Sequence, residues 1–302
     1  MTTLSVRHRT EYRYQQPVSL GEHRLMSRPR DSHDLRLLDT ALMVDPQPSE
    51  LRWMHDVFGN SIAVASFADK SDSLVFESTF RAEHFPIPEQ TIWVEPYATQ
   101  LPFNYSADDS ADLARTQERQ FPDPEHAVDQ WAKSFVDSTP ERNTLNVLIA
   151  MTQAIKRDFD YARREEVGVQ EPTETLRLKS GSCRDFAVFM MEAVRSLGLA
   201  ARFVSGYLYV PERDTGEMYQ GGGATHAWCQ VYLPGSGWVE FDPTNGIVGN
   251  RDLIRVAVAR DARQAIPLHG FYYGDRAHEE GMVVSVGVRS LGDNADSGVV
   301  QC

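Results

Sequence analysis

The sequence has little cysteine, and its few cysteines do not form a recognisable ligand or disulfide pattern. Its 302 residues include three cysteines, Cys183, Cys229 and Cys302, with no C-x-x-C pair among them. An odd, small number of cysteines argues against a disulfide framework and is typical of proteins in a reducing compartment. Without a C-x-x-C pair, a structural zinc site has no obvious set of ligands.

Long apolar runs and excess basic charge are also missing. No apolar segment approaches the ~20 residues of a membrane-spanning helix, and the opening MTTLSVRHRTEYRY lacks the apolar core of a signal peptide. Acidic residues outnumber basic ones by 43 to 30, which gives a net charge of −13. Such an acidic surface repels phosphate groups. We therefore predict a cytoplasmic protein whose partners include neither nucleic acid nor membrane.

The first third of the chain is predicted to be β-rich. VRHRTEYRY, DTALMVDP and NSIAVASFAD alternate polar and apolar residues with period two, and DVFGN (56–60) is typical of a hairpin connection. This pattern predicts a small sandwich or barrel. Prolines then interrupt residues 86–124, for which we predict a crossover without a long regular element.

Helical periodicity begins near Glu125. EHAVDQWAKSFV and RNTLNVLIAMTQAIKRDF place apolar residues at i, i+3, i+4 and i+7. After a loop over 162–180, a helix is expected from about Cys183 to Leu197, closed by Gly198, and strand-like runs follow. The prediction is an α+β protein with a β-rich N-terminal domain over 1–100 and a catalytic domain over 101–302.

Cys183 is the candidate nucleophile. Ser182 and Asp185 have the N-cap and N3 spacing of a capping box, which would place Cys183 in the first helical turn. There the helix dipole favours a thiolate, and free backbone N–H groups can bind an oxyanion. The alternative is that Cys183 is only a small buried residue at the start of a helix.

His226 and Asp242 would complete a catalytic triad, because PGSG joins their two predicted strands in a hairpin. A hairpin that pairs Leu233 with Trp238 would put the two side chains on opposite faces. Pairing Tyr232 with Trp238 instead makes them diagonal neighbours, roughly 7–8 Å apart between Cα atoms. We predict the second register, or an equivalent bulge.

These segments resemble a known family. GSCRDFAVFMMEAVRSLGLAARFVSGYL and THAWCQVYLPGSGWVEFDPTNG are similar to the core of the bacterial transglutaminase-like superfamily, which has a papain-like fold. HRTEYRY, DVFGN and VAVARDARQAIPLHGFYYG resemble the flanking regions of its protease-like branch, although DARQAIP is less acidic and aromatic than that branch would suggest. The resemblance places Cys183, His226 and Asp242 at the triad positions.

The chemistry expected from this triad is acyl transfer on amide bonds through a thioester intermediate, with a peptide or protein as substrate. Transfer to water would make the protein a cysteine peptidase or amidase, which the resemblance favours. Transfer to an amine would make it a transglutaminase or a ligation-type acyltransferase. A third possibility is an inactive binding scaffold. This chemistry needs no cofactor, and the sequence contains no calcium-loop pattern.

Other residues near these motifs have two interpretations each. Tyr161 is a candidate oxyanion or substrate-channel donor, or a tyrosine at a helix end. Trp228 shares a face with His226, where it would cover the site, contact substrate or pack in the core. Cys229 is expected to point away from His226 and to pack in the core. Three glycines, residues 221–223, are expected to form an edge of the cleft.

Overall fold

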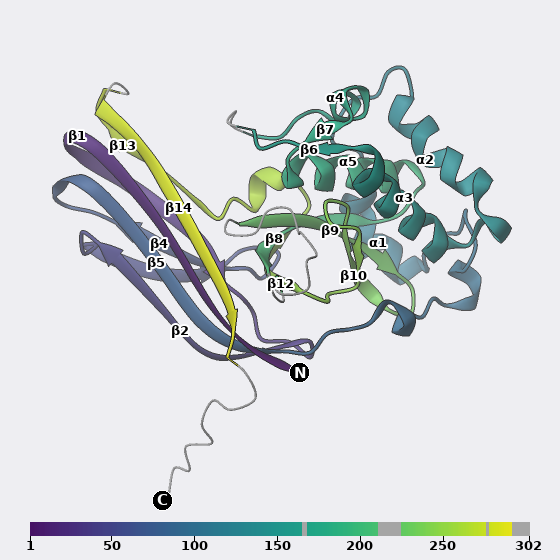
Figure 1. Ribbon diagram of the computed structural model, residues 1–302, viewed down its shortest axis with the longest axis horizontal. Coiled ribbons are helices and arrows are strands. Elements are labelled where there is room, and N and C mark those ends of the chain that lie inside the picture. Colours follow the sequence, from purple (N-terminus) through teal and green to yellow (C-terminus); the bar gives the residue numbers. More distant parts are fainter. Residues whose placement is uncertain (165–167, 211–224, 276–277, 292–302) are drawn as a thin grey trace, which may run out of the picture.

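The computed structural model describes residues 1–164, 168–210, 225–275 and 278–291. Two β-sheets lie side by side, and the helices gather against the second sheet on the side away from the first (Figure 1). No helix among these residues is long and apolar enough to cross a membrane. The glycines at 221–223 lie outside the described ranges.

The elements carry the labels used in Figure 1 and are given in chain order. The strands are β1 (Thr2–Arg28), β2 (Leu35–Asp45), β3 (Glu50–His55), β4 (Ser61–Ser66), β5 (Lys70–His84), β6 (Asp160–Tyr161), β7 (Ser180–Gly181), β8 (Ala201–Leu208), β9 (His226–Leu233), β10 (Gly237–Asp242), β11 (Ile247–Val248), β12 (Leu253–Ala259), β13 (Leu268–Tyr273) and β14 (Glu279–Ser290). The helices are α1 (Ala107–Gln117), α2 (Ala127–Ser138), α3 (Thr144–Asp158), α4 (Pro172–Leu178) and α5 (Cys183–Ser196).

The first sheet is a half-barrel built around the long strand β1. Its strands follow the order β2-β5-β1-β4-β3, and β13 and β14 also pair with β1. Apolar residues alternate along β1 as predicted, and Leu4 and Val6 are buried against Phe80 on β5. The Asp56–Asn60 hairpin forms as predicted between β3 and β4, with Gly59 at φ +76°.

The strands after residue 267 require a correction to the sequence-based picture. The division at residue 100 assigns them to the second domain, yet β13 and β14 hydrogen-bond to β1 in the first sheet. Pairing of β1 with β13 and β14 cannot be read from local patterns, because it joins residues more than 240 positions apart. The two ends of the described chain therefore build one sheet.

The second sheet carries the segments singled out by the sequence motifs. Its order is β11-β10-β9-β8-β12, and β9 pairs antiparallel with both β8 and β10. One face packs against α5, with Cys229 and Val231 of β9 in the same buried cluster as Phe186 and Phe189 of α5. Figure 1 shows α5 lying among the other helices beside this sheet.

Two helices were not predicted. Residues 86–124 were expected to lack a long regular element, but α1 forms there, with the Ser106 side chain accepting from Asp109 N and acidic residues in the first turn. All prolines of this segment lie outside the helix, the nearest at residues 102 and 122, so they bound it without breaking it. Likewise α4 lies within the predicted loop over 162–180 and begins with Pro172 at its first position.

Candidate active site

Cys183 is the first residue of α5, as the sequence predicts. Ser182 is the N-cap, and it forms a capping box with Asp185 in which the two side chains satisfy each other's backbone N–H groups. The first amides of a helix have no acceptor within it, so the Cys183 N–H is available to a reacting group. Cys183 itself is buried, with 7% of its surface exposed.

Asp185 also holds the segment that precedes α5. Its carboxylate accepts from Arg164 Nη1 at 2.8 Å and from the backbone N–H of Gln170 at 2.7 Å. The other oxygen accepts from the Ser182 N–H at 2.8 Å. Because this carboxylate is fully buried, these bonds fix the helix start against residues 164–170.

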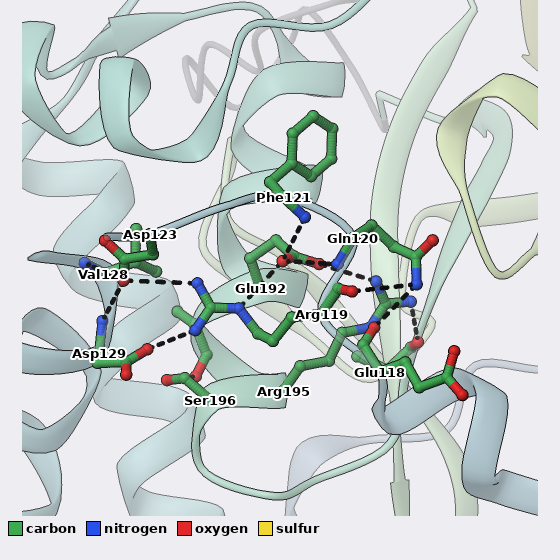
Figure 2. Close-up of polar contacts among 12 residues, drawn as sticks. Glu118, Arg119, Gln120, Phe121, Asp123, Val128, Asp129, Glu192, Arg195 and Ser196 are labelled. Carbon is green, nitrogen blue, oxygen red and sulfur yellow. Dashed lines mark hydrogen bonds and ion pairs between the residues drawn. The ribbon is translucent and has the colours of Figure 1, made fainter. Parts of the chain in front are cut away.

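A buried ion pair anchors the far end of α5. Glu192 and Arg195 are one helical turn apart, their side chains are 1% exposed, and their N–O distance is 2.9 Å. Figure 2 shows that the Glu192 carboxylate also accepts hydrogen bonds from Arg119 Nε and from the backbone N–H groups of Gln120 and Phe121. This network fastens the helix of Cys183 to the segment between α1 and α2, so the position of its first turn is well determined.

Arg195 extends the same anchor to the second sheet. Its guanidinium donates to the carbonyls of Ala201 at 2.9 Å and of Arg260 at 2.7 Å. These residues lie at the start of β8 and just after β12, so α5 is tied to two strands of the sheet that also contains β9.

His226 and Asp242 meet as the second predicted register requires. Tyr232 pairs with Trp238 across β9 and β10, which makes His226 and Asp242 diagonal neighbours on adjacent strands. Their side chains are joined by a 2.8 Å contact between His226 Nε2 and Asp242 Oδ2, and both are fully buried.

The turn after β10 holds the Asp242 carboxylate in place. Oδ1 accepts the backbone N–H of Thr244 at 2.9 Å, and Oδ2 accepts Asn245 Nδ2 at 2.8 Å. The Asn245 amide also lies 3.4 Å from His226 Nε2. Sequence reasoning missed Asn245. The local signal here is an Asx turn, in which the Asp242 side chain accepts the N–H of Thr244 two residues later, and this signal does not mark Asn245.

The electrostatics of the pair favour a charged histidine. Burial alone would lower the pKa of His226, but the charge and hydrogen bond of Asp242, together with the nearby Cys183 thiol, raise it to about 10. For Asp242, burial opposes ionisation, but the His226 charge and the bonds from His226, Asn245 and Thr244 lower the pKa of the carboxyl. Both shifts favour an imidazolium–carboxylate pair at neutral pH.

The second ring nitrogen of His226 is the one left available to the thiol. Nε2 is engaged by Asp242, whereas Nδ1 is buried and makes no hydrogen bond within the described part of the chain. The Cys183 thiol is close enough to contribute to the raised pKa of the ring. Contacts between a nucleophile and its base are often long before substrate binds.

Comparison with known proteins supports the resemblance seen in the motifs. Residues 129–243, which include Cys183, His226 and Asp242, match the model of the transglutaminase-like superfamily. Residues 4–83 match the bacterial transglutaminase-like N-terminal region. The chain belongs to the transglutaminase-like superfamily.

Relatives that match nearly the whole chain and relatives that match a part of it are known. An uncharacterised protein of Mycobacterium tuberculosis is 29% identical over 296 residues, covering 94% of this chain and 90% of its own. One from Mycobacterium leprae is 39% identical over 106 residues, covering 35% and 37%. A proposed cysteine protease from Cytophaga hutchinsonii has the same fold, with a TM-score of 0.72 at 17% identity over 98% of this chain and 92% of that one.

Trp228 lies behind the histidine of the transglutaminase-like core. Its ring stacks on that of His226, with 5.8 Å between the ring centroids, and it is completely buried. A side chain at Gly206, which pairs with His226, would clash with the Ile254 carbonyl oxygen at 2.1 Å and with the Trp228 ring at 2.7 Å. Trp228 therefore packs in the core and supports the His226 ring. A contact between Trp228 and substrate stays a prediction.

A chain of polar contacts continues from Trp228 to the first sheet. Trp228 Nε1 donates to Glu240 Oε2 at 3.1 Å, and Glu240 Oε1 accepts Arg255 Nη1 at 2.6 Å. Arg255 also pairs with Asp34, which precedes β2, at 3.2 Å. Glu240 and Arg255 were not singled out in the sequence, because nothing local marks a buried charge whose partner lies on another strand.

The remaining candidates are divided between the site and the core. Tyr161 is half-buried on β6, which pairs with β7 directly before α5, and burial together with the neighbouring Cys183 raises the pKa of its phenol. Its role as an oxyanion or channel donor stays a prediction. Cys229 is fully buried in the cluster under α5, where Sγ donates weakly to the Phe241 carbonyl at 3.5 Å.

Proposed function

We propose that this protein is a cysteine peptidase or amidase that acts on peptide or protein amide bonds through a thioester intermediate. The observation that carries the proposal is the arrangement of His226. Asp242 engages one ring nitrogen, and the other is left for Cys183 at the start of α5. This arrangement supports the proposal, because acyl transfer by a cysteine requires a nucleophile, a base and a carboxylate that orients the base.

In the first half-reaction, the Cys183 thiolate attacks the amide carbonyl carbon. The Cys183 N–H, at the N-terminus of α5, stabilises the oxyanion of the tetrahedral intermediate. The His226 imidazolium transfers its proton to the amide nitrogen, the C–N bond breaks and the amine leaves. The acyl group remains on sulfur as a thioester, and the neutral imidazole is held in orientation by Asp242.

In the second half-reaction, His226 takes a proton from water as the water oxygen attacks the thioester. The C–S bond breaks, releasing a carboxylic acid and regenerating the thiolate–imidazolium pair. An amine in place of water would give a transglutaminase or ligation-type product by the same steps. A cytoplasmic location belongs to the same proposal, since a free thiol nucleophile must stay reduced.

A mixed peptide pool analysed by mass spectrometry, with and without a primary amine, tests the proposal. We expect cleaved or deamidated products that do not depend on the amine and that disappear with Cys183→Ala. Asp242→Asn should lower kcat by roughly 10²–10⁴-fold while changing KM little, because the ring loses its orienting charge. Amine-bearing products would instead identify a transferase.

An inactive scaffold would behave differently in a second measurement that needs no substrate. We expect iodoacetamide to modify Cys183 at pH 6 faster than it modifies free cysteine, whose pKa of ~8.5 leaves little thiolate at that pH. Reaction no faster than free cysteine, together with a peptide pool left unchanged by a folded protein, would support the scaffold and overturn the proposal.

A further inference from the structure

A cavity of ≈ 510 Å³ lies between the two sheets, apart from the triad. The loop after β1 and the hairpin between β3 and β4 line one side, and β8, β9, β10 and β12 line the other. Cys183, His226 and Asp242 are not among its lining residues. The volume is within the ~300–1,000 Å³ of small-molecule sites, which occur preferentially at such interfaces.

Arg202 of β8 is the decisive group in this cavity. Its Nε donates to Gln230 Oε1 at 2.6 Å, and its guanidinium lies over the Trp238 ring, 4.2 Å from the centroid. Burial lowers the pKa of Arg202 to about 10. Among the described residues Arg202 forms no ion pair with a carboxylate. The charge of Glu240, which is itself paired with Arg255, only partly offsets the burial of the Arg202 cation.

The orientation of Gln230 supports the same interpretation. Because its Oε1 accepts from Arg202, its amide nitrogen must face the other way, and this Nε2 is buried without a hydrogen-bond partner in the described residues. This nitrogen is not accessible from the cavity. Gln230 therefore engages only Nε of Arg202, and the terminal nitrogens of the guanidinium can donate to an acceptor in the cavity.

The other charges of the wall limit what the anion can be. Arg255 is paired with both Asp34 and Glu240, and Asp31 also lines the cavity. These carboxylates would repel a multiply charged phosphate more strongly than an anion that carries a single charge. Apolar side chains complete the lining: Phe58, Ile87, Ile92, Trp238, Val256 and Val258.

We infer that this cavity binds a small organic monocarboxylate, with its carboxylate on Arg202 and its apolar body against Trp238 and Phe58. The planar guanidinium suits bidentate recognition of a carboxylate. Stacking on Trp238 and the bond to Gln230 hold the guanidinium in one orientation, so little side-chain entropy is lost on binding. This site is separate from the proposed acyl-transfer chemistry.

Calorimetric titration of full-length Cys183→Ala with 3-phenylpropionate tests the inference, since this variant cannot hydrolyse or acylate. We expect binding with a Kd below about 1 mM, no detectable binding of the neutral 3-phenylpropionamide, and weaker binding of inorganic phosphate. Arg202→Gln should weaken carboxylate binding about tenfold or more, because a hydrogen-bonded charge is lost.

A second variant and a matched control keep the test decisive. Gln230→Glu supplies Arg202 with a carboxylate from the protein itself and should abolish binding. Arg260→Gln removes an arginine that bonds Gln120 outside the cavity, and it should leave the Kd unchanged. Equal affinity for the amide, tighter binding of phosphate, or unaltered binding in folded Arg202→Gln would each overturn the inference. None of these outcomes depends on turnover at Cys183.

Discussion

At the scale of single residues, the pairing of His226 with Asp242 determines the protonation of the site. The carboxylate is held by the turn after β10 and the imidazole by Trp228, so neither side chain can turn away to find another partner. Both are fully buried, where the mutual attraction of their charges is least screened. The folded state therefore retains a proton on His226 that the unfolded chain would release at neutral pH.

This retained proton predicts how stability depends on pH. The pKa of His226 is raised to about 10 from 6.5, so its contribution is fully present below pH 6.5 and is lost as pH rises towards about 10. Urea unfolding between these pH values should show a steeper loss of stability for the natural chain than for His226→Gln.

The comparison of the two chains isolates this one group. The buried histidines His8, His23 and His84, whose pKa values are lowered by burial, are common to both chains, and their effects cancel. Parallel stability curves for the two chains would mean that His226 is neutral in the folded protein. The thiolate–imidazolium pair of the proposed mechanism would then lose its basis.

Sequence reasoning reached the residues with local signals and missed those without them. Cys183 follows a capping box and precedes a helical pattern, and the hairpin between His226 and Asp242 has a register that can be deduced from its loop. Asn245 and Glu240 act through contacts made only in the folded chain. Their residue types are common on protein surfaces, so burial had to be seen in the structure.

At the scale of elements, α5 is positioned at both ends by buried charges. Asp185 fixes its first turn, and the Glu192–Arg195 pair fixes its last turns to two strands and to the segment before α2 (Figure 2). A helix that is buried on all sides cannot rely on solvent to hydrate these charges. Each one depends on its partner, so the anchor should be sensitive to the loss of a single charge.

Glu192→Gln tests this dependence. Removing the charge leaves the buried Arg195 without its ion-pair partner, while Arg119 keeps Asp123 and Asp129, and the free energy of unfolding should fall by about 3–5 kcal/mol in urea denaturation. Glu174→Gln on α4 is a matched control, since Glu174 also pairs with an arginine three residues later but with 41% of its side chain exposed. There the change should stay below about 1 kcal/mol. Equal losses in the two variants would show that burial does not strengthen the Glu192 pair.

Helices were predicted correctly where apolar residues repeat with helical period over a long segment. They were missed where the main signal was a capping residue. The helices around residues 127–138 and 144–158 have apolar stripes that identify them. The α1 sequence is largely polar and acidic, with Leu113 its one buried residue among those described. The prolines on either side of α1 favour a loop more strongly than the Ser106 cap favours a helix, so the pattern of residues 86–124 does not predict α1.

At the scale of the whole molecule, the first sheet is part of the support for the site. Leu35 and Phe80 of the first sheet pack with Tyr207 and Ile254 of the second in one buried cluster. Next to this apolar contact, Asp34 reaches Arg255, which bonds Glu240, which bonds the tryptophan behind His226. Since β13 and β14 pair with β1, the integrity of the first sheet depends on strands from both ends of the described chain.

Asp34→Asn should therefore destabilise the protein in a way that another aspartate of the same sheet does not. Asp34 is buried and accepts from Ser32, Asn250 and Arg255, so losing its charge should lower the free energy of unfolding by about 1–3 kcal/mol. Asp39→Asn is the control: Asp39 pairs with Arg81 with 49% of its side chain exposed, and its change should stay within about 0.5 kcal/mol. If urea denaturation gave the same small change for both, the sheets would be joined by their apolar cluster alone, and the polar chain to Trp228 would carry no part of the coupling.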